Sequence, residues 1–95
     1  MKKKILIIED DIQIGSLEEE VLNNNGYQCF RAYSGSEAVL LLEKESIDLI
    51  ILDLMLPAMS EEVLKKSGDI PVIVVSAKAD INDKVECLKM VHRTI

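Results

Sequence analysis

Four short segments of the chain have the pattern of β-strands. They span residues 4–8, 28–32, 49–52 and 72–75. The first, third and fourth are nearly continuous apolar runs rich in isoleucine, leucine and valine, which is typical of strands buried on both faces. Each of these three runs stops at a polar or acidic residue, so the ends of the strands are well marked.

Helices are predicted between and after these strands, at 12–25, 34–45 and 81–90, and the interval around 60–66 leaves room for only a short helix. The apolar faces consist of Ile14, Leu17, Val21 and Leu22 in the first helix and of Ala38, Val39, Leu41 and Leu42 in the second. Asp11 is the predicted N-cap of the first helix, and Gly26 ends it. Ser34 begins the second helix, with Glu37 at the spacing of a capping box.

The alternation of strands and helices predicts an α/β fold, in which a parallel sheet has helices on both faces. The expected arrangement is the flavodoxin-like doubly wound sheet, with the strands in the order 2-1-3-4. Ligands bind such sheets outside the carboxyl ends of the strands, where the strand order reverses. The 95 residues are enough for one compact domain, which we expect to span 1–95.

Charge and composition argue against several classes of protein. A formal net charge of −6 disfavours a broad nucleic-acid surface, because binding to phosphate backbones depends on clustered lysine and arginine. We therefore expect this chain itself to bind no nucleic acid. No apolar run approaches the roughly 20 residues of a membrane helix, and nothing directs the chain to export, so a cytoplasmic location is expected. Cys29 and Cys87 are expected to be reduced core residues rather than zinc ligands.

Residues suited to phosphate and metal chemistry follow three of the predicted strands. Glu9 and Asp10 follow the first strand, Asp53 the third and Ser76 the fourth. In the expected strand order Asp53 is central, and carboxylates one strand apart would repel by about 4 kcal/mol per pair at an effective dielectric constant of about 20. Mg²⁺ would relieve that repulsion. Asp53 would then attack phosphorus as a carboxylate nucleophile, and the Ser76 hydroxyl would donate to a phosphoryl oxygen.

Three stretches of sequence carry a resemblance to a known family. They are KKILIIEDD at 3–11, DLIILDLMLP at 48–57 and DIPVIVVSAK at 69–78. In this order they resemble the CheY-like receiver domains of two-component response regulators, over about residues 3–90. The sequence DLMLP is most similar to receivers that precede winged-helix DNA-binding domains.

The resemblance implies a role for each of the residues at the strand ends. Asp53 would be the phosphoacceptor, and Mg²⁺ would be bound by Asp10, Asp53 and the backbone carbonyl of Met55. Glu9 would act on the metal through water. Ser76 would be the switch hydroxyl that moves inward on phosphorylation. The implied partner is a sensor histidine kinase.

The chain departs from the receiver pattern in its last part. A fifth strand, its terminal lysine and a fifth helix have no counterpart, and Lys78 is only a weak substitute for that lysine. The segment from Asp53 to Ser76 is also about one helical turn short. Without a fifth strand the fourth would be an unpaired edge. Either a homodimer or a domain-swapped dimer covers this edge, or the sequence omits residues of the full protein.

Two other functions are weighed against the phosphoacceptor. A pseudo-receiver would keep the fold as a protein-interaction module without a working switch, and the missing lysine favours it. A phosphohydrolase with an Asp53 nucleophile would need an acid two residues later, where this chain has Met55. We therefore expect no enzyme, beyond self-catalysed phosphotransfer and slow autodephosphorylation.

Overall fold

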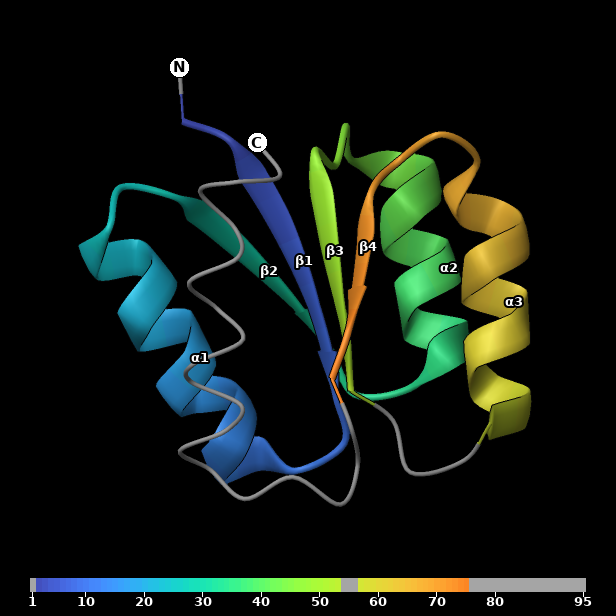
Figure 1. Ribbon diagram of the computed structural model, residues 1–95, viewed down its shortest axis with the longest axis horizontal. Coiled ribbons are helices and arrows are strands. Elements are labelled where there is room, and N and C mark those ends of the chain that lie inside the picture. Colours follow the sequence, from blue (N-terminus) through green and yellow to red (C-terminus); the bar gives the residue numbers. More distant parts are fainter. Residues whose placement is uncertain (1, 54–56, 76–95) are drawn as a thin grey trace.

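The computed structural model of the chain describes residues 2–53 and 57–75, in which strands and helices alternate (Figure 1). The elements are β1 (Lys4–Glu9), α1 (Ile12–Asn24), β2 (Gln28–Ala32), α2 (Gly35–Lys44), β3 (Leu49–Asp53), α3 (Pro57–Ser67) and β4 (Val72–Val74). All four predicted strands are present within one residue of their expected bounds. The helix predicted at 81–90 lies outside the described residues.

The four strands form one parallel sheet in the order β2-β1-β3-β4, as the sequence predicts (Figure 1). The chain leaves β1, forms β2 on one side, and then crosses to form β3 on the other side of β1. Strand order therefore reverses between β1 and β3, and this is the place where doubly wound sheets bind ligands. Within the described residues, β4 forms an edge of the sheet, and its Val74 is exposed.

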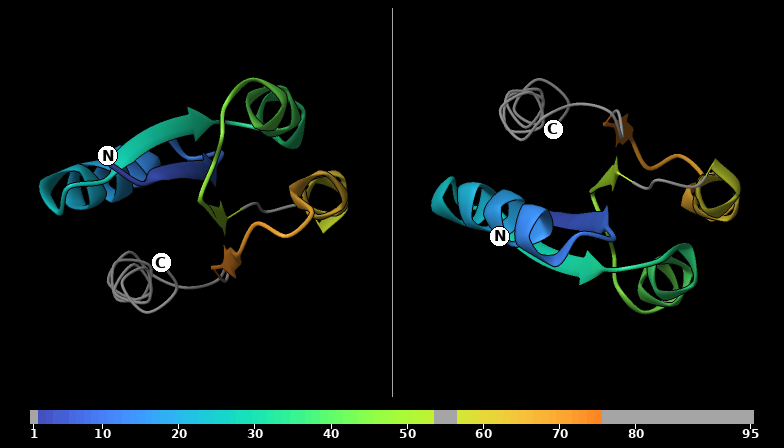
Figure 2. Two further views of the ribbon diagram at one scale, coloured as in Figure 1. Left: turned by 90° about the horizontal axis from the view of Figure 1, so that it is seen from above. Right: turned by 90° about the horizontal axis from the view of Figure 1, so that it is seen from below.

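Helices cover both faces of the sheet, with α1 on one face and α2 and α3 on the other (Figure 2). The buried side chains accordingly form two clusters. The α1-side cluster contains Ile5, Ile7, Leu22, Leu49, Ile51 and Val75, and the opposite cluster contains Leu6, Ile8, Ala32, Ala38, Ile47, Ile50, Leu52 and Val63. Alternate residues of β1 and β3 thus point to opposite faces, because successive side chains of a strand do so.

The start of α2 and the end of α1 lie where the sequence predicts them. Ser34 precedes α2, and its hydroxyl oxygen accepts a hydrogen bond from the Glu37 backbone N–H at 3.3 Å. Gly26 follows α1 with a φ of 88°, which is a left-handed conformation that glycine adopts without steric cost. The sequence therefore fixes both boundaries through local hydrogen bonding and backbone geometry.

The prediction of only a short helix around 60–66 was wrong. Helix α3 runs from Pro57 to Ser67 and has 11 residues, so it begins three residues earlier than expected. Proline suits the first position of a helix, because its fixed φ is helical and the missing N–H would have no intrahelical partner there. Helix α3 is consequently long enough to pack along α2.

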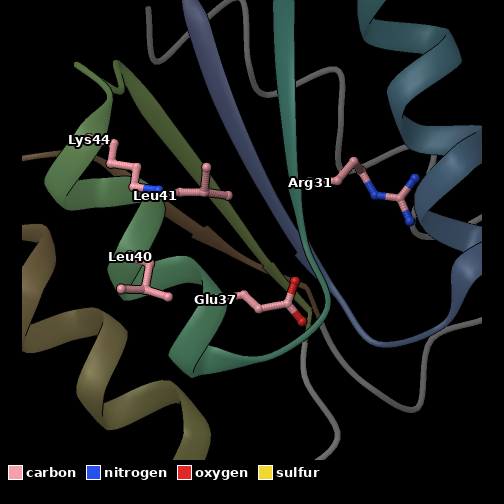
Figure 3. A pocket seen from close by; sticks show the side chains of 5 residues that line it. All are labelled: Arg31, Glu37, Leu40, Leu41 and Lys44. Carbon is pink, nitrogen blue, oxygen red and sulfur yellow. The ribbon is translucent and has the colours of Figure 1, made fainter.

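Helix α1 lies against the sheet through Leu22, which the apolar pattern predicts, and through Gly15 and Glu18, which it does not. Its buried residues are Gly15, Glu18 and Leu22, whereas Ile14, Leu17 and Val21 are only half-buried. Arg31 of β2 points toward α1 (Figure 3), and a Cβ atom at Gly15 would overlap its guanidinium group. Glycine at this position therefore leaves room for Arg31 beneath the helix.

Arg31 also bonds to α1 directly. Its guanidinium donates to the Ser16 hydroxyl and to the Ile12 carbonyl, both at 3.4 Å, and lies 3.8 Å from a carboxylate oxygen of Glu19. These contacts tie the first half of α1 to β2. None of the helices in the described part of the chain has the length and apolar character that a membrane crossing requires.

Cys29 of β2 is a half-buried free thiol that packs against the α1-side cluster, and Cys87 lies outside the described residues. Burial is the main cause that raises the pKa of the Cys29 thiol from 9.0 to about 11, and repulsion by the nearby Glu19 carboxylate is the second cause. Both causes disfavour the thiolate, which is the reactive form.

We expect Cys29 to react slowly with iodoacetamide in the folded protein. At pH 8 a rise in the thiol pKa from 9.0 to about 11 leaves about 100-fold less thiolate. The measurement is alkylation followed by mass spectrometry in a Cys87→Ser background, with the urea-unfolded protein as control. Similar rates in the folded and unfolded states would show that the thiol is neither buried nor perturbed.

Candidate metal centre

Two acidic side chains meet at the place where the strand order reverses. Glu9 is the last residue of β1 and Asp53 the last residue of β3, and the parallel register sets them directly opposite each other. Both are almost fully buried, each with 2% of its surface exposed. The pairing of β1 with β3 therefore fixes two carboxylates at the carboxyl edge of the sheet.

A third carboxylate, that of Glu18, comes from α1. Glu9 and Asp53 continue the alternation of Ile7 and Ile51, whose side chains belong to the α1-side cluster. Their carboxylates thus face α1, where Glu18 is only 1% exposed. One carboxylate oxygen from each of the three residues lies within 4.8 Å of the other two.

The charges of these carboxylates make the cluster a candidate cation site. Two unit charges 4.8 Å apart repel by about 3.5 kcal/mol at an effective dielectric constant of about 20. A divalent cation would turn this repulsion into attraction. The donor atoms are all carboxylate oxygens, which suit hard cations such as Mg²⁺ and Ca²⁺ rather than zinc or copper.

Hydrogen bonds join the acidic end of β1 to the start of α1. The Glu9 Oε1 atom accepts a hydrogen bond from the Asp11 backbone N–H at 3.0 Å. The Asp11 Oδ1 atom in turn accepts from the Ile14 backbone N–H at 3.0 Å, so Asp11 is the N-cap of α1, as predicted. This chain of bonds sets the position of the first turn of α1 relative to Glu9.

The structure brings together only part of the predicted site. Glu9 and Asp53 lie side by side, whereas Asp10 is exposed and its carboxylate is not part of the three-residue cluster among the described residues. Met55 and Ser76 lie outside the described residues, as does Lys78.

Glu18 was missed because charged residues are assigned to the solvent side of a predicted helix. A clue was present in the sequence. Glu18 lies four residues after Ile14 and four before Leu22, on the stripe that an amphipathic helix turns toward its core. An acidic residue in such a stripe indicates either a charge partner or a site.

Two of the pockets lined by described residues lie away from the carboxylate cluster. One of about 260 Å³ is lined by Arg31 of β2 and by Glu37, Leu40, Leu41 and Lys44 of α2 (Figure 3). The other, of about 340 Å³, is lined by Val39, Glu62, Lys65 and Lys66 of α2 and α3. Neither pocket is lined by Glu9, Glu18 or Asp53.

The chain is similar in sequence and in fold to receiver domains of response regulators. The profile of the response regulator receiver domain family matches residues 5–94. The uncharacterized transcriptional regulatory protein YrkP of Bacillus subtilis (strain 168) is 39% identical over 92 residues, which are 93% of this chain and 39% of YrkP. The chain thus spans well under half the length of this curated relative.

Solved structures of receiver proteins have the same fold. A CheY-like response regulator receiver domain protein from Methanospirillum hungatei JF-1 superposes with a TM-score of 0.74 at 28% identity, over 94% of this chain and 75% of that chain. The response regulator TrrA from Thermotoga maritima, in complex with Mg(2+)-BeF, gives a TM-score of 0.70 at 32% identity, over 81% of this chain and 71% of that chain.

We expect Asp11→Ala to lower the free energy of unfolding by about 1 kcal/mol, because the Ile14 N–H at the start of α1 loses its acceptor. Asp11→Asn should cost much less, because asparagine caps helices as well as aspartate does. Urea unfolding followed by circular dichroism measures both variants. Equal losses for the two variants would mean that the charge of Asp11, rather than its capping bond, stabilises the protein.

Proposed function

The chain belongs to the response regulator receiver domain family, and on that premise we propose that it accepts a phosphoryl group on the carboxylate of Asp53. The donor is a phosphohistidine of a sensor histidine kinase. An Asp53 oxygen forms the new bond to phosphorus while the P–N bond to histidine breaks, and the histidine nitrogen takes up a proton. The product is an acyl phosphate.

The position of Asp53 in the sheet is the main support for its role as phosphoacceptor. Asp53 ends β3 at the reversal of strand order and lies opposite Glu9, so its carboxylate is beside a second acid at the ligand-binding edge of the sheet. Transfer of a phosphoryl group passes through a loose transition state, so positioning and charge neutralisation supply most of the rate. The rigid β1–β3 pairing provides the positioning.

We propose Mg²⁺ as the cation of this site. Asp10, Asp53 and the backbone carbonyl of Met55 would bind it directly, and Glu9 would act through water. The bound ion would neutralise charge on the phosphoryl oxygens. The buried all-oxygen donor set of Glu9 and Asp53 fits such an ion, and the complex of the related TrrA with Mg(2+)-BeF supports magnesium binding in this family.

The remaining parts of the proposal concern the response to phosphorylation. The Ser76 hydroxyl would donate to a phosphoryl oxygen and so link Asp53 to the segment after β4. The reaction is self-catalysed transfer to the protein, followed by slow autodephosphorylation, rather than turnover of a substrate. We place the domain in the cytoplasm, where it would contact its kinase and possible homodimer partners and would itself bind no nucleic acid.

Incubation of the protein with Mg²⁺ and acetyl phosphate should add one phosphoryl group, detected by intact mass and mapped to Asp53 after borohydride reduction. Asp53→Asn should remove this modification completely, because the amide is not a carboxylate nucleophile. Asp69→Asn is the matched control, since Asp69 is exposed and precedes β4. EDTA should abolish the modification in the original protein and in Asp69→Asn.

A pseudo-receiver would behave differently in the same experiment. A folded protein that stays unmodified in the presence of Mg²⁺ and acetyl phosphate would contradict phosphoryl acceptance. Binding to a partner that is unaffected by Asp53→Asn would then favour an interaction module that keeps only the fold.

A further inference from the structure

Arg31 is a basic side chain held inside the protein between β2 and α1. The parallel register sets it opposite Ile7 of β1, whose side chain belongs to the α1-side cluster, so Arg31 also points to the α1 face of the sheet. Only 10% of its side chain is exposed. An arginine is buried to this extent mainly where its charge has partners, so the contacts of the guanidinium group indicate its role.

The guanidinium of Arg31 contacts the first two turns of α1. It donates to the Ile12 carbonyl and to the Ser16 hydroxyl, both at 3.4 Å, and a carboxylate oxygen of Glu19 lies 3.8 Å away. It also lies 5.0 Å from the centre of the Tyr33 ring, which is a cation–π distance. A guanidinium group is planar and its donors form a rigid fork, so this set of contacts fixes the helix relative to β2.

Gly15 makes this close approach possible. A Cβ atom at Gly15 would overlap the guanidinium of Arg31. Glycine inside a helix is otherwise unfavourable compared with alanine, because it loses more conformational freedom on folding. The missing side chain at position 15 is therefore matched to the guanidinium that lies beside it.

Hydrogen bonds connect the first turn of α1 to the carboxyl edge of the sheet. The Gly15 N–H donates to the Asp11 carbonyl at 3.0 Å, and the Asp11 N–H donates to the Glu9 Oε1 atom at 3.0 Å. Asp10 lies between these bonded residues in the chain, and Glu9 is opposite Asp53 in the sheet. A shift of the first turn of α1 would therefore reach the segment 9–11 beside the phosphoacceptor.

We propose that Arg31 is a positioning residue for phosphoryl transfer to Asp53. This inference rests on the proposed function and deepens it, because it adds a residue of β2 that acts through the backbone of α1 rather than by contact with the phosphoryl group. By fixing the first turn of α1 against β2, Arg31 holds Asp10 in one place relative to Asp53. The rate of phosphoryl transfer depends on such positioning, and a small displacement of the reacting groups lowers it strongly.

The rate of phosphorylation by acetyl phosphate tests the inference, followed by intact mass at a temperature where circular dichroism shows every variant to be folded. Arg31→Ala should lower the rate constant by about tenfold, which is within the effect of a small misplacement of reacting groups. Val63→Ala is the matched control, because Val63 is buried in the cluster on the opposite face of the sheet. It should lower the melting temperature but change the rate constant by about twofold at most, since distant sites act independently. An equal loss of rate in both variants would show a general effect of stability and overturn the inference.

Gly15→Ala breaks the same contact without removing the arginine. The added Cβ atom occupies the place of the guanidinium, so this variant should lose about as much rate as Arg31→Ala. The double variant should react no more slowly than Arg31→Ala alone, because the clash is then absent and groups in contact do not act additively. An unchanged rate in Gly15→Ala, or a double variant that combines both losses in full, would contradict the role of Arg31.

Amide hydrogen exchange in EDTA, measured by NMR, gives a readout that does not depend on phosphorylation. Arg31→Ala should speed the exchange of the Asp11 and Gly15 amides by about fivefold relative to the amides of β3, because the start of α1 opens more easily. Unchanged exchange at these amides, or equal acceleration throughout the protein, would overturn the inference. Failure of both Arg31→Ala and Gly15→Ala to fold would also overturn it, because the contact would then be needed for folding as a whole.

The original chain distinguishes this inference from the proposed function. If it accepts no phosphoryl group from acetyl phosphate, the proposed function fails, and the role of Arg31 fails with it. If it is phosphorylated on Asp53 and Arg31→Ala reacts at the same rate, only the role of Arg31 is refuted.

Discussion

The parallel pairing of β1 with β3 is the constraint on which the site depends. The two strands are neighbours in space although α1, β2 and α2 separate them along the chain. Their register sets Glu9 against Asp53 at the edge where the strand order reverses. Buried isoleucine and leucine residues on both faces hold this register, because a slip by one residue would turn each apolar side chain of β1 to the opposite face.

The two faces of the sheet differ in the side chains that they carry at the carboxyl edge. Side chains that point toward α2 and α3 form an apolar cluster. On the other face, the apolar cluster under α1 is followed at the carboxyl edge by the carboxylates of Glu9, Glu18 and Asp53. The alternation of side chains along each strand creates this division, and it directs the acids toward the helix that follows β1 directly.

Close packing of α1 makes the acidic cluster possible. The Asp11 cap sets the start of the helix, and the contacts of Arg31 across Gly15 hold its first turns against β2. A helix held so close to the sheet places Glu18 within reach of both strand ends. A bound cation would offset the repulsion between carboxylates held this close together.

The strands, the order of elements, the parallel 2-1-3-4 sheet, the caps at Asp11 and Ser34 and the position of Asp53 at a strand end could all be predicted from the sequence. The strands follow from local periodicity, the caps from the chemistry of aspartate and serine, and the parallel direction from rules of chain connection, whereas the strand order follows the flavodoxin-like arrangement. The length of α3 and the burial of Glu18 were decided only by the tertiary structure. Periodicity shows which residues share a helix face, but an acid becomes buried only when distant strands bring other groups to it.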